Sequence, residues 1–384
     1  MKRKDGNLKP KKKMKTWKKV VITVVIVILA LIILAAGAAA IYLGSLYSKM
    51  SGEDIPIIER EEEYVVPSEP EDGIEEIVDD PEADGTDEEP DDTEPSDTEP
   101  DALDSQVAEF EENQPQDEVT SAPIYKREPL SSDIVNILLL GRDARDNQVA
   151  QGIRGRSDSM IIASFNKSTG EVTLTSIMRD SLVPIQGYGW NRINAAYSYG
   201  GVGLAINTVN DVFDLDIQNY MVIDFSGLRT LVDSLGGVNV YLSAAEVKNY
   251  QGYGKIADGL SEGYNTLNGK QALMHARNRQ VGDDFERTRR QRDILFAIFN
   301  QVKGMNSLSD ALGFVNSASS LITTNLSIGE ITSLATSLFN GNITIKNARI
   351  PCDGSYQNIR YYGALVLKID IQKNADYIHD VLSN

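Results

Sequence analysis

The chain contains very few of the residues that build disulfides, thiol sites and imidazole metal centres. Its 384 residues include one cysteine, Cys352, and two histidines, His275 and His379. A single cysteine excludes an internal disulfide and a cysteine-based metal cage. Zinc sites built on histidine are disfavoured, and a Ser-His-Asp triad is too, because no sequence feature places either histidine near a serine elbow.

Basic residues are almost missing from one long stretch and concentrated in another. Residues 1–50 hold eleven Lys/Arg and one Asp, whereas residues 51–120 hold thirty Asp/Glu and one basic residue, Arg60. The rest of the chain is neutral overall, so the net charge of −19 says nothing about a site there. This balance does not favour nucleic acid as a partner.

Residues 20–43 carry no charge and predict a transmembrane helix. About 20 apolar residues suffice to cross a hydrocarbon core of about 30 Å. Ten basic residues precede the segment within the tail 1–19, which we expect to stay in the cytoplasm. The alternative is a cleaved signal peptide, although its apolar region is normally shorter, about 7–15 residues. We therefore expect a single-pass protein of the cell membrane whose C-terminal domain is extracytoplasmic.

Residues 44–130 have too little apolar character to predict a folded core. They are rich in Glu, Asp, Pro, Ser and Thr, and include the near-repeat DTEPSDTEP at 92–100. Such a stretch cannot bury enough apolar surface to offset its ordering entropy. We predict a disordered acidic linker.

Residues 131–384 predict one layered α-β-α domain built on a central mixed sheet. Apolar runs typical of strands occur at 134–140, 159–165, 171–177, 220–223 and 238–242. Helical spacing occurs at 204–213, 228–235, 268–276 and 284–303, the last with Asp284 as its expected cap. Strands that alternate with helices indicate an α/β fold. Residues 301–384 are expected to complete the same domain with further helices and strands.

Arginines replace lysines in the most charged part of this domain. Six arginines and no lysine lie between Arg277 and Arg292. A guanidinium presents a planar fork of donors that grips phosphate oxygens two at a time, which lysine cannot do. Two upstream clusters of arginine and aspartate, at 141–145 and 154–158, add carboxylates. The combination predicts a site for a polyanionic phosphate with a divalent metal.

The order of these motifs resembles the LytR-CpsA-Psr family of Gram-positive cell envelopes. The resemblance spans residues 134–300 and rests on these segments: NILLLGRDAR at 136–145, RSDSM at 156–160, SIMRD at 176–180, RINAAY at 192–197, DFSG at 224–227, LVDSLGGV at 231–238, LNGKQAL at 267–273, and Arg277, Arg279, Asp284, Arg287, Arg290 and Gln291. It implies an enzyme that takes an anionic glycopolymer, such as teichoic acid or capsule polysaccharide, from a polyisoprenyl-pyrophosphate carrier. The polymer is then joined to peptidoglycan by a phosphodiester.

The resemblance also assigns roles to residues. It implies that Asp143 and Asp158 hold Mg²⁺ (or Mn²⁺), and that Asp143, Arg179 and Arg277 are catalytic. The pyrophosphate-binding residues that it implies are Arg145, Arg179, Arg277, Arg279, Arg287, Arg290 and Gln291. Residue chemistry agrees, since phosphoryl transfer is catalysed mainly by positioning and by electrostatic stabilisation. A carboxylate such as Asp143 is also a candidate to deprotonate the acceptor hydroxyl.

Some features depart from this pattern or carry a structural interpretation. Met178, His275 and Glu286 stand where the family usually has proline, an aromatic and glycine, which leaves every charged group in place. On the predicted helix Arg289 and Arg292 lean away from Arg287, so we expect them to face solvent.

A lipid carrier predicts an apolar channel leading from the arginines. Two other functions stay open: a non-catalytic scaffold or regulator that binds polyprenyl phosphate, and a pyrophosphatase that uses water as the acceptor.

Overall fold

The computed structural model describes residues 55–62, 64–70, 72–76, 105–106, 121–143, 156–305, 318–327 and 344–383, with scattered positions between 307 and 336. The tail 1–19, the apolar segment 20–43, most of the acidic run and Arg145 lie outside the described residues, as does the side chain of Asp143. Among the helices that the structure describes, none is both long and apolar enough to cross a membrane.

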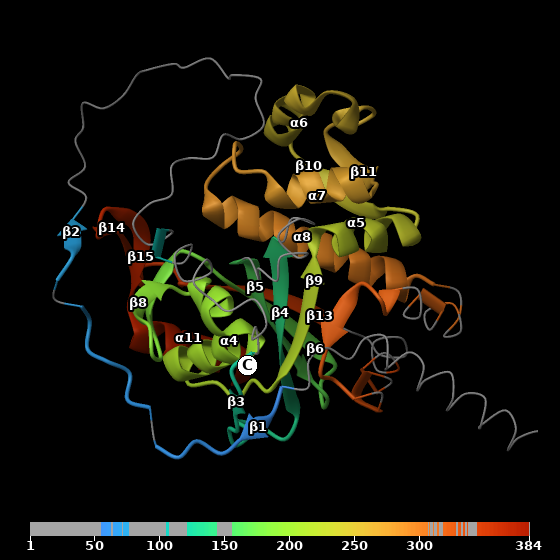
Figure 1. Cartoon of the computed structure of the whole chain (residues 1–384). Coiled ribbons are helices and arrows are strands. Elements are labelled where there is room, and N and C mark those ends of the chain that lie inside the picture. The colour runs from blue at the N-terminus through green and yellow to red at the C-terminus, as the bar shows by residue number, and fades with distance from the viewer. Residues whose placement is uncertain are drawn as a thin grey trace, which may run out of the picture. The chain divides into compact units, whose positions relative to one another are not determined.

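A six-stranded mixed sheet, here called the main sheet, forms the centre of the domain (Figure 1). Its strands, in spatial order, are β12 (Ile322–Thr324), β9 (Asn219–Asp224), β4 (Ile134–Asp143), β5 (Arg156–Asn166), β6 (Glu171–Ile177) and β13 (Thr344–Ile350). β4 runs parallel to β9 and antiparallel to β5, and β6 runs antiparallel to β5. The carboxyl ends of β4, β6 and β9 therefore meet at the edge where β5 begins.

Helices cover both faces of the main sheet. Helix α4 (Ala195–Phe213) packs on one face, and its core with the sheet includes Leu138, Leu140 and Met160, each exposed by no more than 1%. Helix α8 (Asp284–Lys303) crosses the other face, where Arg292 donates to Ser176 Oγ at 2.6 Å. A helix on each side buries both faces of the strands, which explains their nearly continuous apolar sequences. The predicted α-β-α layering is therefore present in the described residues.

Helix α8 belongs to a second apolar core that supports the site. This core combines α8 with α5 (Phe225–Ser234), α7 (Gly269–Arg277) and the two-stranded antiparallel sheet of β10 (Val238–Leu242) and β11 (Gly263–Leu267). Helix α6 (Ala244–Tyr250) and the 3-10 segment η1 (Gln251–Ala257) connect β10 to β11. Figure 1 shows α5, α7 and α8 gathered beyond the carboxyl ends of β4 and β9.

The structure contains a second large sheet that the sequence did not indicate. It consists of β2 (Ile74–Glu76), β14 (Tyr356–Tyr361), β15 (Ala364–Ile369), β7 (Ser181–Ile185) and β8 (Gly189–Arg192) in that spatial order. The final helix, α11 (Ile371–Ser383), packs against α4. β7 pairs with β15, more than 180 positions later in the chain. Pairing over such a separation leaves little local sequence signal.

The prediction of a disordered linker over 44–130 is wrong for several of its segments. Residues 55–62 and 64–70, here called the strap, lie against the domain, and β1 (Ile57–Ile58) pairs in parallel with β3 (Ile124–Tyr125). Arg60 donates to both carboxylate oxygens of Asp211, each at 2.8 Å. Beyond the strap, β2 pairs with β14. The composition of the whole stretch concealed this contact, because it depends on the one basic residue in an acidic run.

Candidate functional site

A β-bulge places the first acidic residue of the site. Along β4 and β5, Gly141 pairs with Ser159 but Arg142 pairs with Ser157, so Asp158 has no partner in the ladder. A bulge twists the strand locally and redirects a side chain, and bulges are frequent next to active sites. The Asp158 side chain turns toward the end of β6, where its Oδ1 lies 3.1 Å from Arg179 Nη1.

Arg179 follows the end of β6 and is held between two carboxylates. Its Nε also donates to Asp180 Oδ2 at 3.2 Å, while Asp180 Oδ1 lies 3.4 Å from Arg192 Nε. Burial disfavours the charge of Arg179, but Asp180, Asp158 and Asp284 outweigh burial and raise its pKa. The guanidinium is therefore permanently charged and its orientation is set. Asp180, the last residue of the SIMRD segment, therefore orients two arginines.

Helix α8 brings Asp284 and Arg287 to the same place. Asp283, and not Asp284 as predicted, caps the helix by accepting from Glu286 N at 3.0 Å. This frees Asp284, whose Oδ2 accepts from Arg287 Nη2 at 2.7 Å. Asp284, expected to cap the helix and also part of the family pattern, is thus a residue of the site. Its position one turn before Arg287 was the available signal.

Burial and repulsion by neighbouring arginines act together on Arg287. Burial, followed by the charge of Arg179, lowers the pKa of Arg287 to about 10 in spite of Asp284, and Arg279 acts in the same direction. Burial disfavours the charged form of Asp284 too, and so raises the pKa of that carboxyl. The charges of Arg179 and Arg279 therefore both oppose the charge of Arg287. An added polyanion would relieve this repulsion, which is the electrostatic signature of an anion site.

Arg277 lies over the ends of the neighbouring strands. It is the last residue of α7, is exposed, and stacks on the ring of Phe225 with 4.8 Å between its Cζ and the ring centroid. Phe225 follows β9, whose last residue, Asp224, is 3.8 Å from Arg142 Nη2 on β4. Arg277 therefore sits beside the end of β4, where the backbone of Asp143 lies. We call Arg179, Arg277, Arg279 and Arg287 the arginine cluster.

The other arginines of the run have different positions. Arg290 is completely buried: its Nη2 donates to the backbone carbonyl of Asn278 at 2.8 Å and its Nη1 lies 3.5 Å from Glu246 Oε1, so its guanidinium is engaged inside the domain. Arg289 pairs with Glu286, Asp293 and Glu246 and is 39% exposed. Arg292 was expected to face solvent but packs on Ser176 of the sheet. Gln291 is half-buried, one turn after Arg287.

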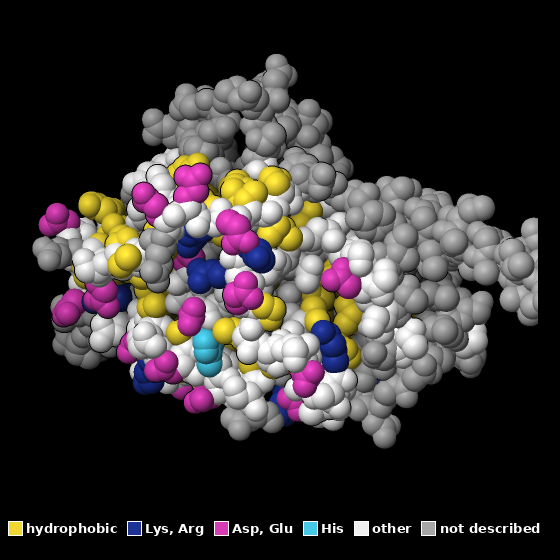
Figure 2. Space-filling model, turned by 90° about the horizontal axis from the view of Figure 1, so that it is seen from below, with side chains coloured by type: hydrophobic (Ala, Val, Ile, Leu, Met, Phe, Trp, Pro, Cys, Tyr) yellow, Lys and Arg dark blue, Asp and Glu magenta, His cyan; other side chains and the backbone are white. Residues whose placement is uncertain are grey.

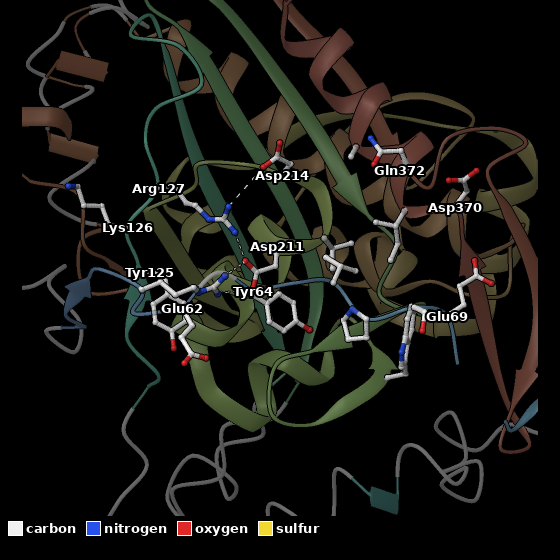
Figure 3. Close-up of a pocket in the computed structure, with 18 residues that line it drawn as sticks. Glu62, Tyr64, Glu69, Tyr125, Lys126, Arg127, Asp211, Asp214, Asp370 and Gln372 are labelled. Atoms are coloured by element: carbon white, nitrogen blue, oxygen red, sulfur yellow. Dashed lines mark hydrogen bonds and ion pairs between the residues drawn. The ribbon is translucent and has the colours of Figure 1, made fainter. Parts of the chain in front are cut away.

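A groove of about 810 Å³ lies elsewhere, between the strap and the domain (Figure 3). Figure 3 shows Arg127 directed at Asp211, with Tyr64 and Tyr125 nearby. Arg60 pairs with the same carboxylate at 2.8 Å. None of the residues that line the groove belongs to the arginine cluster.

The expected apolar channel from the arginines is not this groove. In addition, the described core beneath the main sheet is closed, since side chains such as Leu140 and Ile162 are buried almost completely. The predicted channel therefore does not pass between these side chains.

Figure 2 shows basic and acidic side chains interleaved on the face seen from below.

Two carboxylates were predicted to hold Mg²⁺. Asp158 stands at the bulge with its carboxylate toward the arginine cluster, and Asp143 ends the adjacent strand in register with Arg156. Among the described side chains, no three His, Cys, Asp or Glu residues gather into a metal-binding group. Magnesium usually takes one or two carboxylates and completes its shell with waters and phosphate oxygens. The chemistry of this donor pair therefore fits Mg²⁺ bound together with a phosphate.

Comparison with known proteins gives a consistent result. The LytR_cpsA_psr family matches residues 101–377. "Polyisoprenyl-teichoic acid--peptidoglycan teichoic acid transferase TagU" of Oceanobacillus iheyensis is 34% identical over 239 residues, which cover 60% of this chain and 71% of that protein. "Biofilm regulatory protein A" of Streptococcus mutans is 31% identical over 51% of each chain. The structure "TagT bound to LI-WTA" is similar with a TM-score of 0.54 and 27% identity, over 67% of this chain and 93% of that one.

Proposed function

Because this chain belongs to the LytR-CpsA-Psr family, we propose that it is a phosphotransferase acting on a glycopolymer carried by polyisoprenyl pyrophosphate. It transfers the anionic polymer to peptidoglycan and forms a phosphodiester. The observation that carries this proposal is the arginine cluster at the carboxyl ends of β4, β6 and β9. The names of relatives such as TagU support the same class of reaction, as does the similarity to the solved structure "TagT bound to LI-WTA".

The arginine cluster suits a pyrophosphate more than a single phosphate. Its guanidiniums come from three elements: Arg179 from the end of β6, Arg277 and Arg279 from the end of α7, and Arg287 from α8. Each can donate two parallel hydrogen bonds to a phosphate. Guanidiniums that surround a ligand from several elements can bind oxygens on two phosphorus atoms. Asp180 and Asp284 keep Arg179 and Arg287 pre-oriented through bonds of 3.2 and 2.7 Å.

The chemical step needs charge stabilisation and one proton acceptor. The acceptor hydroxyl oxygen forms a new bond to the phosphorus on the glycopolymer side, and the bond from that phosphorus to the bridging oxygen breaks. Polyisoprenyl phosphate leaves, and the hydroxyl proton passes to a carboxylate, for which we propose Asp143. Arg179 and Arg287 stabilise the charge on the phosphoryl and leaving oxygens. Arg277, Arg279, Arg145 and Gln291 complete the proposed phosphate contacts.

Magnesium belongs to this proposal as a bound cofactor. Asp143 and Asp158 would hold it, and its charge would neutralise phosphate oxygens when it is bound. Asp158 also pairs with Arg179 at 3.1 Å. The same aspartate therefore limits the mobility of that arginine.

We also propose a location for the reaction. If residues 20–43 span the membrane with the basic tail in the cytoplasm, the folded domain lies on the outer face. A lipid-linked substrate and peptidoglycan are both accessible there.

One incubation separates this function from its rivals. Full-length protein in detergent is mixed with a lipid-pyrophosphate-linked oligosaccharide, Mg²⁺ and peptidoglycan oligomers, and the products are resolved by mass spectrometry. We expect oligosaccharide joined to peptidoglycan together with free lipid phosphate. Lipid phosphate without ligation would identify a pyrophosphatase, and binding without turnover would leave only a scaffold or regulator. The Arg277→Ala and Asp143→Ala variants should lose turnover and keep their melting temperature. The control Arg360→Ala, on the remote strand β14, should keep both turnover and melting temperature.

A further inference from the structure

The loop between α7 and α8 displays two arginines of the cluster. Arg277 and Arg279 are exposed, whereas Asn278 between them is 1% exposed. An alternation of this kind requires the backbone to hold its inward residue firmly, because both neighbours are long and solvated. What holds Asn278 therefore decides where two phosphate-binding side chains point.

The backbone of Asn278 is held by Arg290 from the second turn of α8. Arg290 Nη2 donates to the Asn278 carbonyl oxygen at 2.8 Å, and Arg290 is fully buried. A buried guanidinium is stable only when it is paired. Its partner is Glu246, whose Oε1 lies 3.5 Å from Arg290 Nη1 and whose side chain is 2% exposed.

Glu246 is itself fixed by the start of α6. Its Oε2 accepts from Ser243 N at 2.8 Å and from Ser243 Oγ at 2.9 Å, which closes a capping box. Its Oε1 faces Arg290 and also Arg289, the latter at 3.1 Å. A chain of contacts therefore runs from the cap of α6 through a buried ion pair to the arginine loop.

The side chain of Asn278 fastens the loop from its other side. Its Nδ2 donates to Asn249 Oδ1 at 2.6 Å, and its Oδ1 accepts from the amide of Val281 at 3.1 Å. Asn249 in turn donates to Gln280 Oε1 at 2.8 Å. The amide of Val281 therefore reports directly on whether this loop keeps its conformation.

We propose that Arg290 is a positioning residue of the anion site: it does not touch the phosphate but holds the Asn278 backbone so that Arg277 and Arg279 project together. The inference rests on the proposed phosphate role of those two arginines. Arg290 would therefore differ in function from Arg277, Arg279 and Arg287, although all four residues are arginines. Arg289 shares the Glu246 carboxylate but does not bond to Asn278, so it supplies a matched control.

The test uses full-length protein with the substitutions Arg290→Met and Arg289→Met. Methionine is close in length to arginine, and in Arg290→Met the Glu246 carboxylate keeps Arg289 as its partner. Amide hydrogen exchange of Val281 is followed without ligand, and inorganic pyrophosphate binding is measured by calorimetry well below the melting temperature. Should Arg290→Met fail to fold, Arg290→Lys preserves the buried charge and removes the planar fork.

For Arg290→Met we expect Val281 to exchange at least about tenfold faster and pyrophosphate to bind at least about tenfold more weakly, since one charged hydrogen bond is lost. Amides of β4 should exchange as before, and Arg289→Met should match wild type in both measurements. Weaker binding with unchanged Val281 exchange would mean that Arg290 contacts the anion itself, which overturns the positioning role. Unchanged values in both would overturn it as well. If wild-type protein fails to bind pyrophosphate, the proposed function fails, and Val281 exchange alone decides this inference.

Discussion

Arg179 and Asp158 form an ion pair of 3.1 Å that joins the end of β6 to the bulge in β5. The pair connects a proposed phosphate ligand to a proposed metal ligand. A phosphate would bind Arg179 and Mg²⁺ would bind Asp158, so each ligand would engage one member of this ion pair. This relationship makes the role of Asp158 measurable.

Replacing Asp158 with asparagine should separate metal dependence from phosphate affinity. In wild type we expect Mg²⁺ to strengthen pyrophosphate binding at least about tenfold, which corresponds to about 1.4 kcal/mol. Asp158→Asn should lose that gain and, in EDTA, bind pyrophosphate at least as tightly, because one nearby negative charge is gone. Calorimetry with and without Mg²⁺ measures both. An undiminished Mg²⁺ gain in the variant would exclude Asp158 as a ligand; Glu171→Gln, which removes a remote acid, is the control.

Arg287→Lys should show that the guanidinium fork matters beyond its charge. Arg287 is almost completely buried and bonds Asp284 Oδ2 at 2.7 Å through Nη2, and lysine cannot keep that bond while gripping a phosphate. We expect turnover to fall at least about 100-fold, as for the loss of one preorganised donor at a developing charge. Arg289→Lys, two positions along the same helix, should keep its rate. Equal rates for the two variants would remove Arg287 from the site.

The stability of the domain should fall in acid because of His275. Burial, assisted by Arg290 and Arg289 and opposed by Glu246, lowers the pKa of His275 to about 4. The native state therefore binds fewer protons than the unfolded chain, whose histidine pKa is about 6.5. The free energy of unfolding therefore rises with pH across this window. As the pH falls from about 6.5 toward 4, it decreases by up to about 3 kcal/mol.

Thermal melts at several pH values measure the contribution of His275. Tyr250 Oη lies 2.7 Å from His275 Nδ1, so the comparison needs the double variant His275→Phe/Tyr250→Phe, which removes the titrating ring and its partner together. The melting temperature of the variant should decline less between pH 6.5 and 4. Parallel curves for the two proteins would show that His275 does not carry the effect.

The substitution Arg60→Met should weaken the contact between the strap and the rest of the domain. Arg60 makes two 2.8 Å bonds to Asp211, whose side chain is 2% exposed, and its guanidinium stacks on Tyr125 at 4.2 Å. Losing a hydrogen-bonded charge of this kind lowers the free energy of unfolding by about 2 kcal/mol. The amides of Ile124 and Lys126, which donate to strap carbonyls, should exchange faster. Lys126→Met, which breaks only exposed pairs with Glu59 and Glu128, should leave exchange at Ile124 unchanged.

Local patterns predicted much of the fold. The apolar runs at 134–140, 159–165 and 171–177 became β4, β5 and β6, and the spacing at 268–276 and 284–303 became α7 and α8. These elements have strong periodicity of their own, so their sequence suffices. The second large sheet and the strap escaped prediction because they form through partners distant in sequence, as in the pair of Arg60 with Asp211.

The chemistry of this protein is legible in its local sequence: arginines stand in place of lysines, aspartates stand at strand ends, and the order of motifs identifies the family. The role of each arginine depends instead on packing between segments that are distant in sequence. Arg287 and Arg290 are three residues apart on one helix, yet one meets Asp284 at the site and the other is buried beneath Asn278. The physical reason is that a side chain's role depends on which carboxylate or carbonyl faces it, and long-range packing sets that partner.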